Sequence, residues 1–328
     1  MQKACTSFRY RLFTSTIKSY KMNIKKNIIK AFIGGIAACL CMACGGSDSK
    51  DYWGDTSGGG DEEPTENPNA SKPRYIWIDA AANFPDFANS KENITRDLAL
   101  AKDAGFTDIV VDVRPTTGDV LFKTNHVDQV KFMYAWIGSN YTKVERTATW
   151  DYLQAFVDEA RKQGLRIHAA INTFVGGNQI DGGTGLLYRD QSKAAWATQM
   201  NMQTGITSVM NTSESAKFFN PAHPEVQTFL CNLLKDLASY DLDGIFLDRG
   251  RFLNLQTDFS DESRKQFEAY MGGIKIQNYP DDILAPGASS LPATYPKYMT
   301  KWLEFRAKVI YDFMQKARTA VKGVKHGI

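Results

Sequence analysis

The stretch that decides the fold reads Tyr240-Asp241-Leu242-Asp243-Gly244-Ile245-Phe246-Leu247-Asp248-Arg249-Gly250-Arg251-Phe252. A short apolar segment with the character of a β-strand ends there on a carboxylate, Asp248, and two arginines follow it. In a parallel α/β barrel, side chains at the carboxyl ends of the strands line the mouth of the active site, so a charge there indicates chemistry. We therefore interpret Asp248 as the leading candidate for a catalytic residue.

Short apolar strands alternate with amphipathic helices from residue 74 onward, which is typical of βα units on a parallel sheet. The predicted strands cover residues 75–79, 108–115, 166–172 and 244–248. The predicted helices cover residues 94–104, 150–163, 224–240, 262–271 and 298–321. This pattern predicts an α/β fold, a (β/α)₈ barrel of TIM type, of which residues 73–328 supply the first four to five units. Because such a barrel needs eight strands to close, we expect the chain to be part of a longer protein; a half barrel that dimerises is the alternative.

The first 44 residues resemble a bacterial lipoprotein signal, and Met22 is an alternative start for it. Three lysines precede an apolar run over residues 31–43, which is too short for a membrane-spanning helix of about 20 residues. We expect lipidation at Cys44, because the polar segment begins directly after it, while Cys39 fits the usual lipobox better. The protein is then expected in the cell envelope, lipid-anchored to the outer membrane and facing either the surface or the periplasm.

Composition narrows the possible partners, disulfides and cofactors of the protein. Residues 45–72 are acidic and rich in Gly and Ser, which predicts a flexible tether. Residues 1–43 hold eight Lys or Arg and no Asp or Glu, so the formal net charge changes from +3 to −5 without them, and we expect no nucleic acid partner. Cys231 is the one cysteine beyond the leader, which predicts neither a disulfide nor a cysteine metal site. No phosphate loop or zinc motif is present in the sequence, so we expect no cofactor and no metal.

Two long insertions, residues 116–149 and 175–219, follow the carboxyl ends of predicted strands. Loops of this length in a compact domain are usually functional, and these two stand where a substrate cleft would form. Trp136 and Trp196 lie in them, and aromatic rings in exposed loops suit stacking against sugar rings. We predict that both bind substrate; packing of the insertions onto the barrel is the alternative reading for each ring.

Polar side chains also end the first three predicted strands. Asp112 and Arg114 are two residues apart in one strand, so we expect both side chains on the same face of the sheet. They would bind substrate hydroxyls or, alternatively, form a salt-bridged lock at the top of the barrel. The arginines after Asp248 would favour its ionised form. The complete predicted substrate-binding set is Asp79, Asp112, Arg114, Asn172, Arg249, Arg251, Trp136 and Trp196.

Five blocks of sequence, in this order, resemble the family-10-like glycosyl hydrolases, which are relatives of the alpha-amylase superfamily. The blocks are residues 75–79, 105–115, 164–172, 219–226 and 243–248. The resemblance implies a barrel that cleaves glycosidic bonds with strand-end carboxylates. It further implies Asp248 as the nucleophile of a retaining mechanism, with a glutamate on a fifth strand, beyond residue 328, as the general acid. Two positions depart from the family pattern: Phe246 stands where an arginine is common, and Arg249 where a second acidic residue is common.

Two classes of function follow from this reading. The first is a glycoside hydrolase that acts on poly- or oligosaccharides, and the retained Asp248 favours it. The second is a non-catalytic glycan-binding surface lipoprotein on a degenerate hydrolase barrel, and Arg249 favours it. Both classes have carbohydrate as a partner and the membrane as an attachment site through the lipid.

Overall fold

The structure is a computed structural model and describes residues 72–327. The predicted signal peptide, its candidate lipidation sites Cys44 and Cys39, and the tether through residue 71 lie outside the described residues. Within the described part, no helix is both long enough and apolar enough to cross a membrane.

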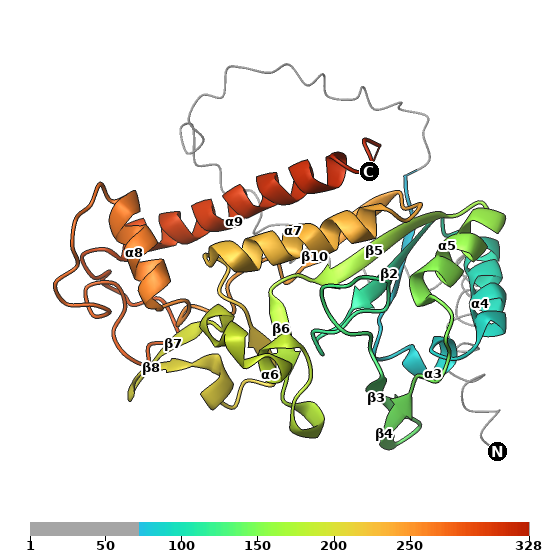
Figure 1. The fold of residues 1–328 in the computed structure, drawn as a ribbon, viewed down its shortest axis with the longest axis horizontal. Helices are drawn as coiled ribbons and strands as arrows, with labels where there is room; N and C mark the ends of the chain where they lie inside the picture. Colours follow the sequence, from blue (N-terminus) through green and yellow to red (C-terminus); the bar gives the residue numbers. More distant parts are fainter. Residues whose placement is uncertain (1–71, 328) are drawn as a thin grey trace, which may run out of the picture. The chain divides into compact units, whose positions relative to one another are not determined.

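Four parallel strands form the central sheet and lie side by side in chain order (Figure 1). They are β1 (Tyr75–Ile78), β2 (Asp108–Arg114), β5 (Arg166–Asn172) and β10 (Gly244–Asp248). This confirms the four predicted strands to within one residue at each end. A strand order that follows the chain, with a helix in each connection, is the arrangement of a (β/α)₈ barrel. Residues 323–327, where a fifth unit would begin, form no strand, so the described part holds four units of the barrel.

Helices cover the outer face of this sheet. In Figure 1, α4 (Lys91–Asp103) lies against α5 (Tyr152–Lys162), and α7 (Pro224–Ala238) lies beside α9 (Met299–Lys322). Every second side chain of β2 points toward these helices and is fully buried, namely Ile109, Val111 and Val113. Because strand side chains alternate between faces, the residues between them are left for the inside of the barrel.

Side-chain capping sets where the first two long helices begin. The Ser90 hydroxyl accepts a hydrogen bond from the Asn93 N–H, 3.1 Å away, and α4 starts directly after Ser90. The Asp151 carboxylate accepts from the Gln154 N–H at 3.1 Å, so α5 starts after Asp151. The expected start of α5 at residue 150 is therefore wrong by two residues, because the capping acceptor is Asp151.

The two long insertions fold into hairpins and short helices beyond the carboxyl ends of the strands. Three antiparallel pairs form, β3 (Phe132–Ile137) with β4 (Asn140–Glu145), β6 (Val175–Asn178) with β9 (Ala216–Phe218), and β7 (Gln199–Met202) with β8 (Gly205–Ser208). Their short helices are α6 (Leu186–Arg189), η1 (Ile180–Gly182), η2 (Gln191–Trp196) and η3 (Val209–Asn211); a further short helix, α3 (Phe84–Phe87), follows β1 outside the insertions. The insertions are thus ordered structure built over the edge of the sheet where a substrate would enter.

A second apolar cluster lies at the far end of the molecule, between α8 (Asp261–Tyr270) and the start of α9. Trp302 is its centre, with ring centroids 4.9 Å from Phe267 and 5.2 Å from Phe259. The buried carboxylate of Asp258 accepts hydrogen bonds from Thr198 and Ser263, which joins this cluster to the second insertion. The predicted helices near residues 262–271 and 298–321 are confirmed as α8 and α9.

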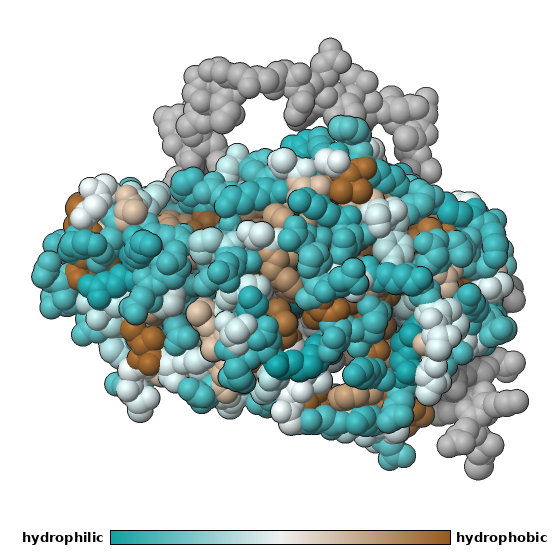
Figure 2. All heavy atoms as spheres, viewed as in Figure 1, coloured by the Kyte–Doolittle hydropathy of each residue, from teal (hydrophilic) through white to brown (hydrophobic). Residues whose placement is uncertain are grey.

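The sheet is strongly curved, as a barrel wall is. Tyr75 in β1 and Phe246 in β10 come from the two outermost strands, yet their ring centroids are 6.0 Å apart on the inner face. Trp77 also contacts Phe246, at 5.7 Å between centroids. The inner face therefore carries aromatic side chains in its middle and polar ones at the strand ends. On the face of the molecule shown in Figure 2, hydrophilic residues predominate and hydrophobic ones gather in recesses across the middle.

Candidate functional site

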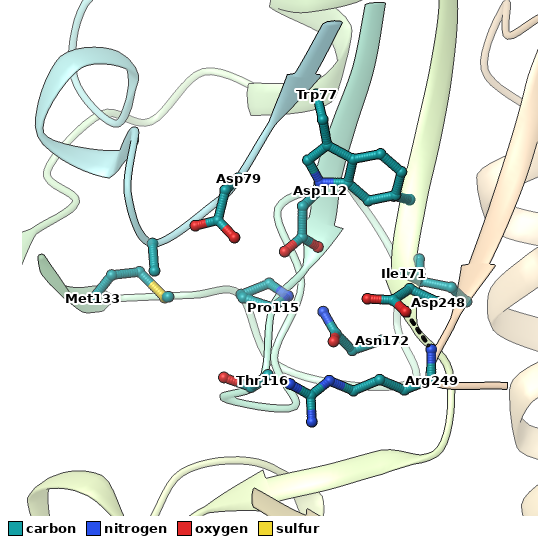
Figure 3. Close-up of a pocket in the computed structure, with 12 residues that line it drawn as sticks. Trp77, Asp79, Asp112, Pro115, Thr116, Met133, Ile171, Asn172, Asp248 and Arg249 are labelled. Carbon is teal, nitrogen blue, oxygen red and sulfur yellow. Dashed lines mark hydrogen bonds between the residues drawn. The ribbon is translucent and has the colours of Figure 1, made fainter. Parts of the chain in front are cut away.

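A pocket opens on the inner face of the sheet at the carboxyl ends of its strands (Figure 3). All four strands contribute to its wall, and the β3 strand of the first insertion closes one side. The lining residues are Trp77, Asp79, Ala81, Asp112, Pro115, Thr116, Met133, Ala170, Ile171, Asn172, Asp248 and Arg249. This is the position at which barrel enzymes place their active sites, because the loops after each strand converge there.

Three carboxyl groups and one amide converge in this pocket. Figure 3 shows the side chains of Asp79, Asp112, Asn172 and Asp248 directed into the same space, from the ends of four different strands. Asn172 and Asp248 lie side by side because they are the last paired residues in the register of β5 and β10. Four of the residues predicted from strand ends are thus brought together by the fold.

The three carboxyl groups differ in their surroundings. Asp79 is exposed and its Oδ1 accepts the Ala82 N–H at 2.7 Å, which fixes the turn after β1. Asp248 is exposed and its Oδ1 accepts the Arg249 N–H at 2.7 Å. Asp112 is buried, with 7% of its surface exposed, and accepts the Arg114 N–H at 3.2 Å.

The pKa of Asp112 is raised far above that of an ordinary carboxyl group. Burial, the largest cause, and the negative charges of Asp79 and Asp248 together raise it to about 7, against two backbone hydrogen bonds that lower it. A carboxyl group removed from water favours its neutral form, and like charges nearby reinforce that preference. Asp112 therefore keeps its proton at a higher pH than an exposed carboxyl group does, and in its neutral form it can donate a hydrogen bond into the pocket.

Arg114 does not reach the pocket, so its predicted role in substrate binding is wrong. Its guanidinium is fully buried and donates hydrogen bonds to the backbone carbonyls of Asn172, Thr173 and Val175. The β2–β5 register shifts between Asp112 and Arg114, so Arg114 stands at the irregular end of the strand, beside the carbonyls that it bonds. Burial also lowers the pKa of Arg114 to about 10. Arg114 fixes the chain that leaves β5 and carries no substrate contact.

The two arginines after Asp248 have different positions. Arg249 lines the pocket, and its backbone has the left-handed φ of 48° that non-glycine residues rarely adopt. Such strain is retained at functional sites when the surrounding structure holds it in place. Arg251 points elsewhere: its guanidinium donates to the Phe252 and Leu253 carbonyls and lies over the Phe218 ring. Of the predicted pair, the structure brings Arg249 to the site and leaves Arg251 outside the lining.

The two predicted tryptophans also lie in different surroundings. Trp196 is 5% exposed, its Nε1 donates to Glu225 at 2.9 Å, and its ring packs against Phe229. Its predicted contact with substrate is therefore wrong, and the packing alternative describes it. Trp136 is exposed, on the β3–β4 hairpin, and lies outside the pocket lining.

Sequence reasoning missed Trp77, Thr116 and Met133, which line the pocket. Trp77 had a readable signal, because it precedes Asp79 by two positions in the same strand and strand side chains alternate between faces. Met133 had no such signal, since its place depends on how the first insertion folds back over the sheet. Among residues 72–327, no group of three or more His, Cys, Asp or Glu side chains is arranged to hold a metal ion.

The parallel half barrel and its strand-end carboxyl groups define the class of protein, a (β/α)₈ barrel of the glycosidase type. The chain belongs to the glycosyl hydrolase-like 10 family, whose model matches residues 72–328. This confirms the resemblance seen in the sequence. An S-layer-related protein of Niallia circulans is 31% identical over 258 residues, which cover 76% of this chain but only 16% of that protein's length.

One solved structure supports the same fold. Alpha-L-fucosidase isoenzyme 2 from Paenibacillus thiaminolyticus superposes with a TM-score of 0.50 at 17% identity, over 78% of this chain and 32% of that chain. The catalytic domain of beta-amylase from Paenibacillus polymyxa gives a TM-score of 0.49 at 14% identity, over 76% of this chain and 62% of that chain. At such low identity the likeness to the fucosidase establishes the barrel fold and nothing about the substrate.

Proposed function

We propose that this chain carries part of the active site of a glycoside hydrolase that cleaves glycosidic bonds in poly- or oligosaccharides. The observation that carries the proposal is the convergence of Asp79, Asp112 and Asp248 on one pocket at the strand ends, in a chain of this family. Glycoside hydrolysis needs one ionised and one protonated carboxyl group on either side of the scissile bond. Asp248 is the nucleophile of that pair in our proposal, since it is exposed in the pocket at the carboxyl end of β10.

Asp112 binds the sugar in this scheme and takes no part in bond cleavage. A neutral carboxyl group both donates and accepts hydrogen bonds, so it suits a substrate hydroxyl at the buried floor of the pocket. Asp79 and Asn172 complete the polar lining, and the Trp77 ring forms its apolar side. The general acid is expected on a fifth strand beside β10, as the family resemblance implies, so the activity is proposed for the full-length gene product.

Asp248→Asn in the full-length gene product tests this proposal. The substitution removes the charge and keeps the size of the side chain, so we expect reducing-sugar release from a panel of poly- and oligosaccharides to fall by at least about 10³-fold. Glycan binding and the thermal unfolding temperature should stay near those of the wild-type protein, because Asp248 is exposed. Unchanged release in the variant would remove Asp248 from the mechanism.

A second candidate function has its own observation. Arg249 lines the pocket at the position where the family resemblance places a second acidic residue, and it brings a cation to the mouth of the pocket. This arrangement favours a glycan-binding protein that has lost its chemistry. Binding to the same panel without sugar release, in both the wild-type protein and Asp248→Asn, would support this second function and contradict the first.

We also propose that the protein is attached to the cell envelope through a lipid on Cys44. The support is the leader and the polar segment that follows it. The relative from Niallia circulans is described as S-layer-related, which is consistent with a place at the cell surface.

A further inference from the structure

The β3–β4 hairpin of the first insertion has two faces of opposite character. Phe132, Tyr134 and Trp136 alternate along β3 on one face, and the register places Glu145, Lys143 and Tyr141 opposite them on β4. The other face carries Met133 and Ala135, which are buried against the domain with 4% and 3% exposure. Figure 1 shows the hairpin projecting from the edge of the molecule that lies beyond the strand ends.

The outer face of the hairpin, which we call the aromatic ledge, presents a row of rings to solvent. Tyr134 and Tyr141 are stacked with centroids 5.3 Å apart and planes inclined by 30°, and Trp136 lies 5.3 Å from Tyr141. Trp136 is 60% exposed and Tyr141 is 55% exposed, although both are large rings that proteins normally cover. Exposed apolar surface gathered in one place marks an interaction site more often than a scattered residue does.

Contacts beneath and beside the ledge hold these rings in place. The Tyr134 hydroxyl donates to the Asp181 carboxylate at 2.7 Å, and the Lys143 ammonium binds the same carboxylate. That ammonium also lies 4.0 Å from the centroid of the Phe132 ring. The Asn89 side chain donates to the Glu145 carbonyl at 2.8 Å, which ties the end of β4 to the body of the domain. The ledge is therefore preorganised, so little ordering entropy opposes binding to it.

The chemistry of the ledge fits a glycan better than the core of a protein interface. Its rings are mostly Tyr and Trp, which combine an apolar face with a polar edge, and its remaining members are the charged Lys143 and Glu145. A pyranose ring has the complementary shape, with C–H groups on its faces and hydroxyls around its rim. A protein interface core is instead depleted of charged residues.

The hairpin that carries the ledge also borders the candidate site. Met133, on the opposite face of the same strand, lines the carboxylate pocket. Phe132 and Asp181 line a second hollow next to it, together with Arg189. A glycan held on the ledge would thus be kept beside the pocket in which a bond is cut.

We propose that the aromatic ledge is a second glycan-binding surface, which holds a polysaccharide chain by stacking its sugar rings on Trp136, Tyr141 and Tyr134. The proposal rests on the proposed function only for the class of ligand. It assigns the ledge to capture of the polymer and leaves bond cleavage to the carboxylate pocket. Loss of the ledge should therefore weaken binding to long chains while short soluble substrates are processed normally.

Pull-down of the full-length gene product on starch granules, cellulose, chitin and xylan tests the ledge. We expect the wild-type protein to bind at least one of these solids, and Trp136→Ala with Tyr141→Ala to weaken that binding about tenfold or more. Ile137→Ala is the matched control, because Ile137 is 44% exposed on the same hairpin but belongs to its other face, and its binding should stay within about twofold of wild type. Unfolding temperatures of all variants are compared to confirm that each is folded.

Two results would overturn the proposal: no binding of the wild-type protein to any of the four solids, or equal binding by the Trp136→Ala, Tyr141→Ala variant. Asp248→Asn separates this question from catalysis, since it should bind the solids as the wild-type protein does. If Asp248→Asn keeps its hydrolytic activity, the proposed mechanism fails while the binding result for the ledge still stands.

Discussion

Replacing Asp112 by Asn should stabilise the protein in a pH-dependent way. Asp112 is buried beside the charges of Asp79 and Asp248, and this environment raises its pKa from 3.8 to about 7. Asparagine has nearly the same shape and imitates the neutral carboxyl group, but it cannot ionise. The variant thus removes the cost of burying a charge and keeps the volume of the side chain.

The sign and size follow from proton linkage. Between pH 4 and pH 7 the folded state keeps the Asp112 proton while the unfolded chain has lost it, so the free energy of unfolding falls as pH rises through this range. The difference between a pKa of 3.8 and a pKa of about 7 corresponds to roughly 4 kcal/mol in the free energy of unfolding. This contribution is fully lost above pH 7. The backbone hydrogen bonds from Arg114 and Ala80 favour the ionised form, and their weakening in the variant reduces the gain. We therefore expect Asp112→Asn to be more stable than wild type by up to about 4 kcal/mol at pH 8 and nearly equal at pH 4.

Urea unfolding followed by tryptophan fluorescence at pH 4, 6 and 8 measures this difference. The control is Asp79→Asn, which removes the neighbouring charge and should recover only part of the stability, since burial is the larger cause of the shift. A difference between Asp112→Asn and wild type that is the same at all three pH values would refute the reasoning. The same variant also tests the mechanism: because Asp112 binds the sugar in our proposal, sugar release by the full-length protein should persist in Asp112→Asn, and its complete loss would make Asp112 the general acid.

The remaining predictions concern a buried cation and the leader. Arg114→Met should lower the free energy of unfolding by about 3 kcal/mol in urea titrations, because three backbone carbonyls lose their hydrogen bond donor inside the protein; a loss below about 1 kcal/mol would contradict the structural role. Cys44→Ser should abolish incorporation of a labelled fatty acid in cells while Cys39→Ser leaves it intact, and the reverse pattern would move the lipid to Cys39.

The core of the fold was predictable because it obeys one local rule. Each of the four strands is a short apolar run whose outer side chains, such as Val111 and Ile167, must be covered by a helix, and the helices carry matching apolar stripes. The insertions follow no such rule. Whether Trp196 faces solvent or the core depends on its hydrogen bond to Glu225, 29 residues further along the chain, and nothing in its local sequence indicates that partner.

Most polar residues of the candidate site were also predictable from the sequence, and Arg114 is the exception. Asp79, Asp112, Asn172 and Asp248 converge because the ends of parallel strands lie at one edge of a sheet. Arg114 was harder to place, because its guanidinium bonds backbone carbonyls of residues 172, 173 and 175, which nothing in its local sequence indicates. Strand alternation assigns a side chain to one face of a sheet, but whether that side chain reaches the pocket or bonds the backbone beside it depends on tertiary contacts.

The convergence of three carboxyl groups is itself an argument for function. Burial and the negative charges of Asp79 and Asp248 raise the pKa of Asp112, so ionisation of this carboxyl group in the folded protein costs stability. An amide at this position would give a more stable protein above neutral pH, as the first prediction states. Where a simple substitution would make a protein more stable, the residue that is present is typically kept for binding or chemistry. The predicted gain in stability of Asp112→Asn, measured together with a loss of affinity for substrate, would show that the fold trades stability for recognition at this pocket.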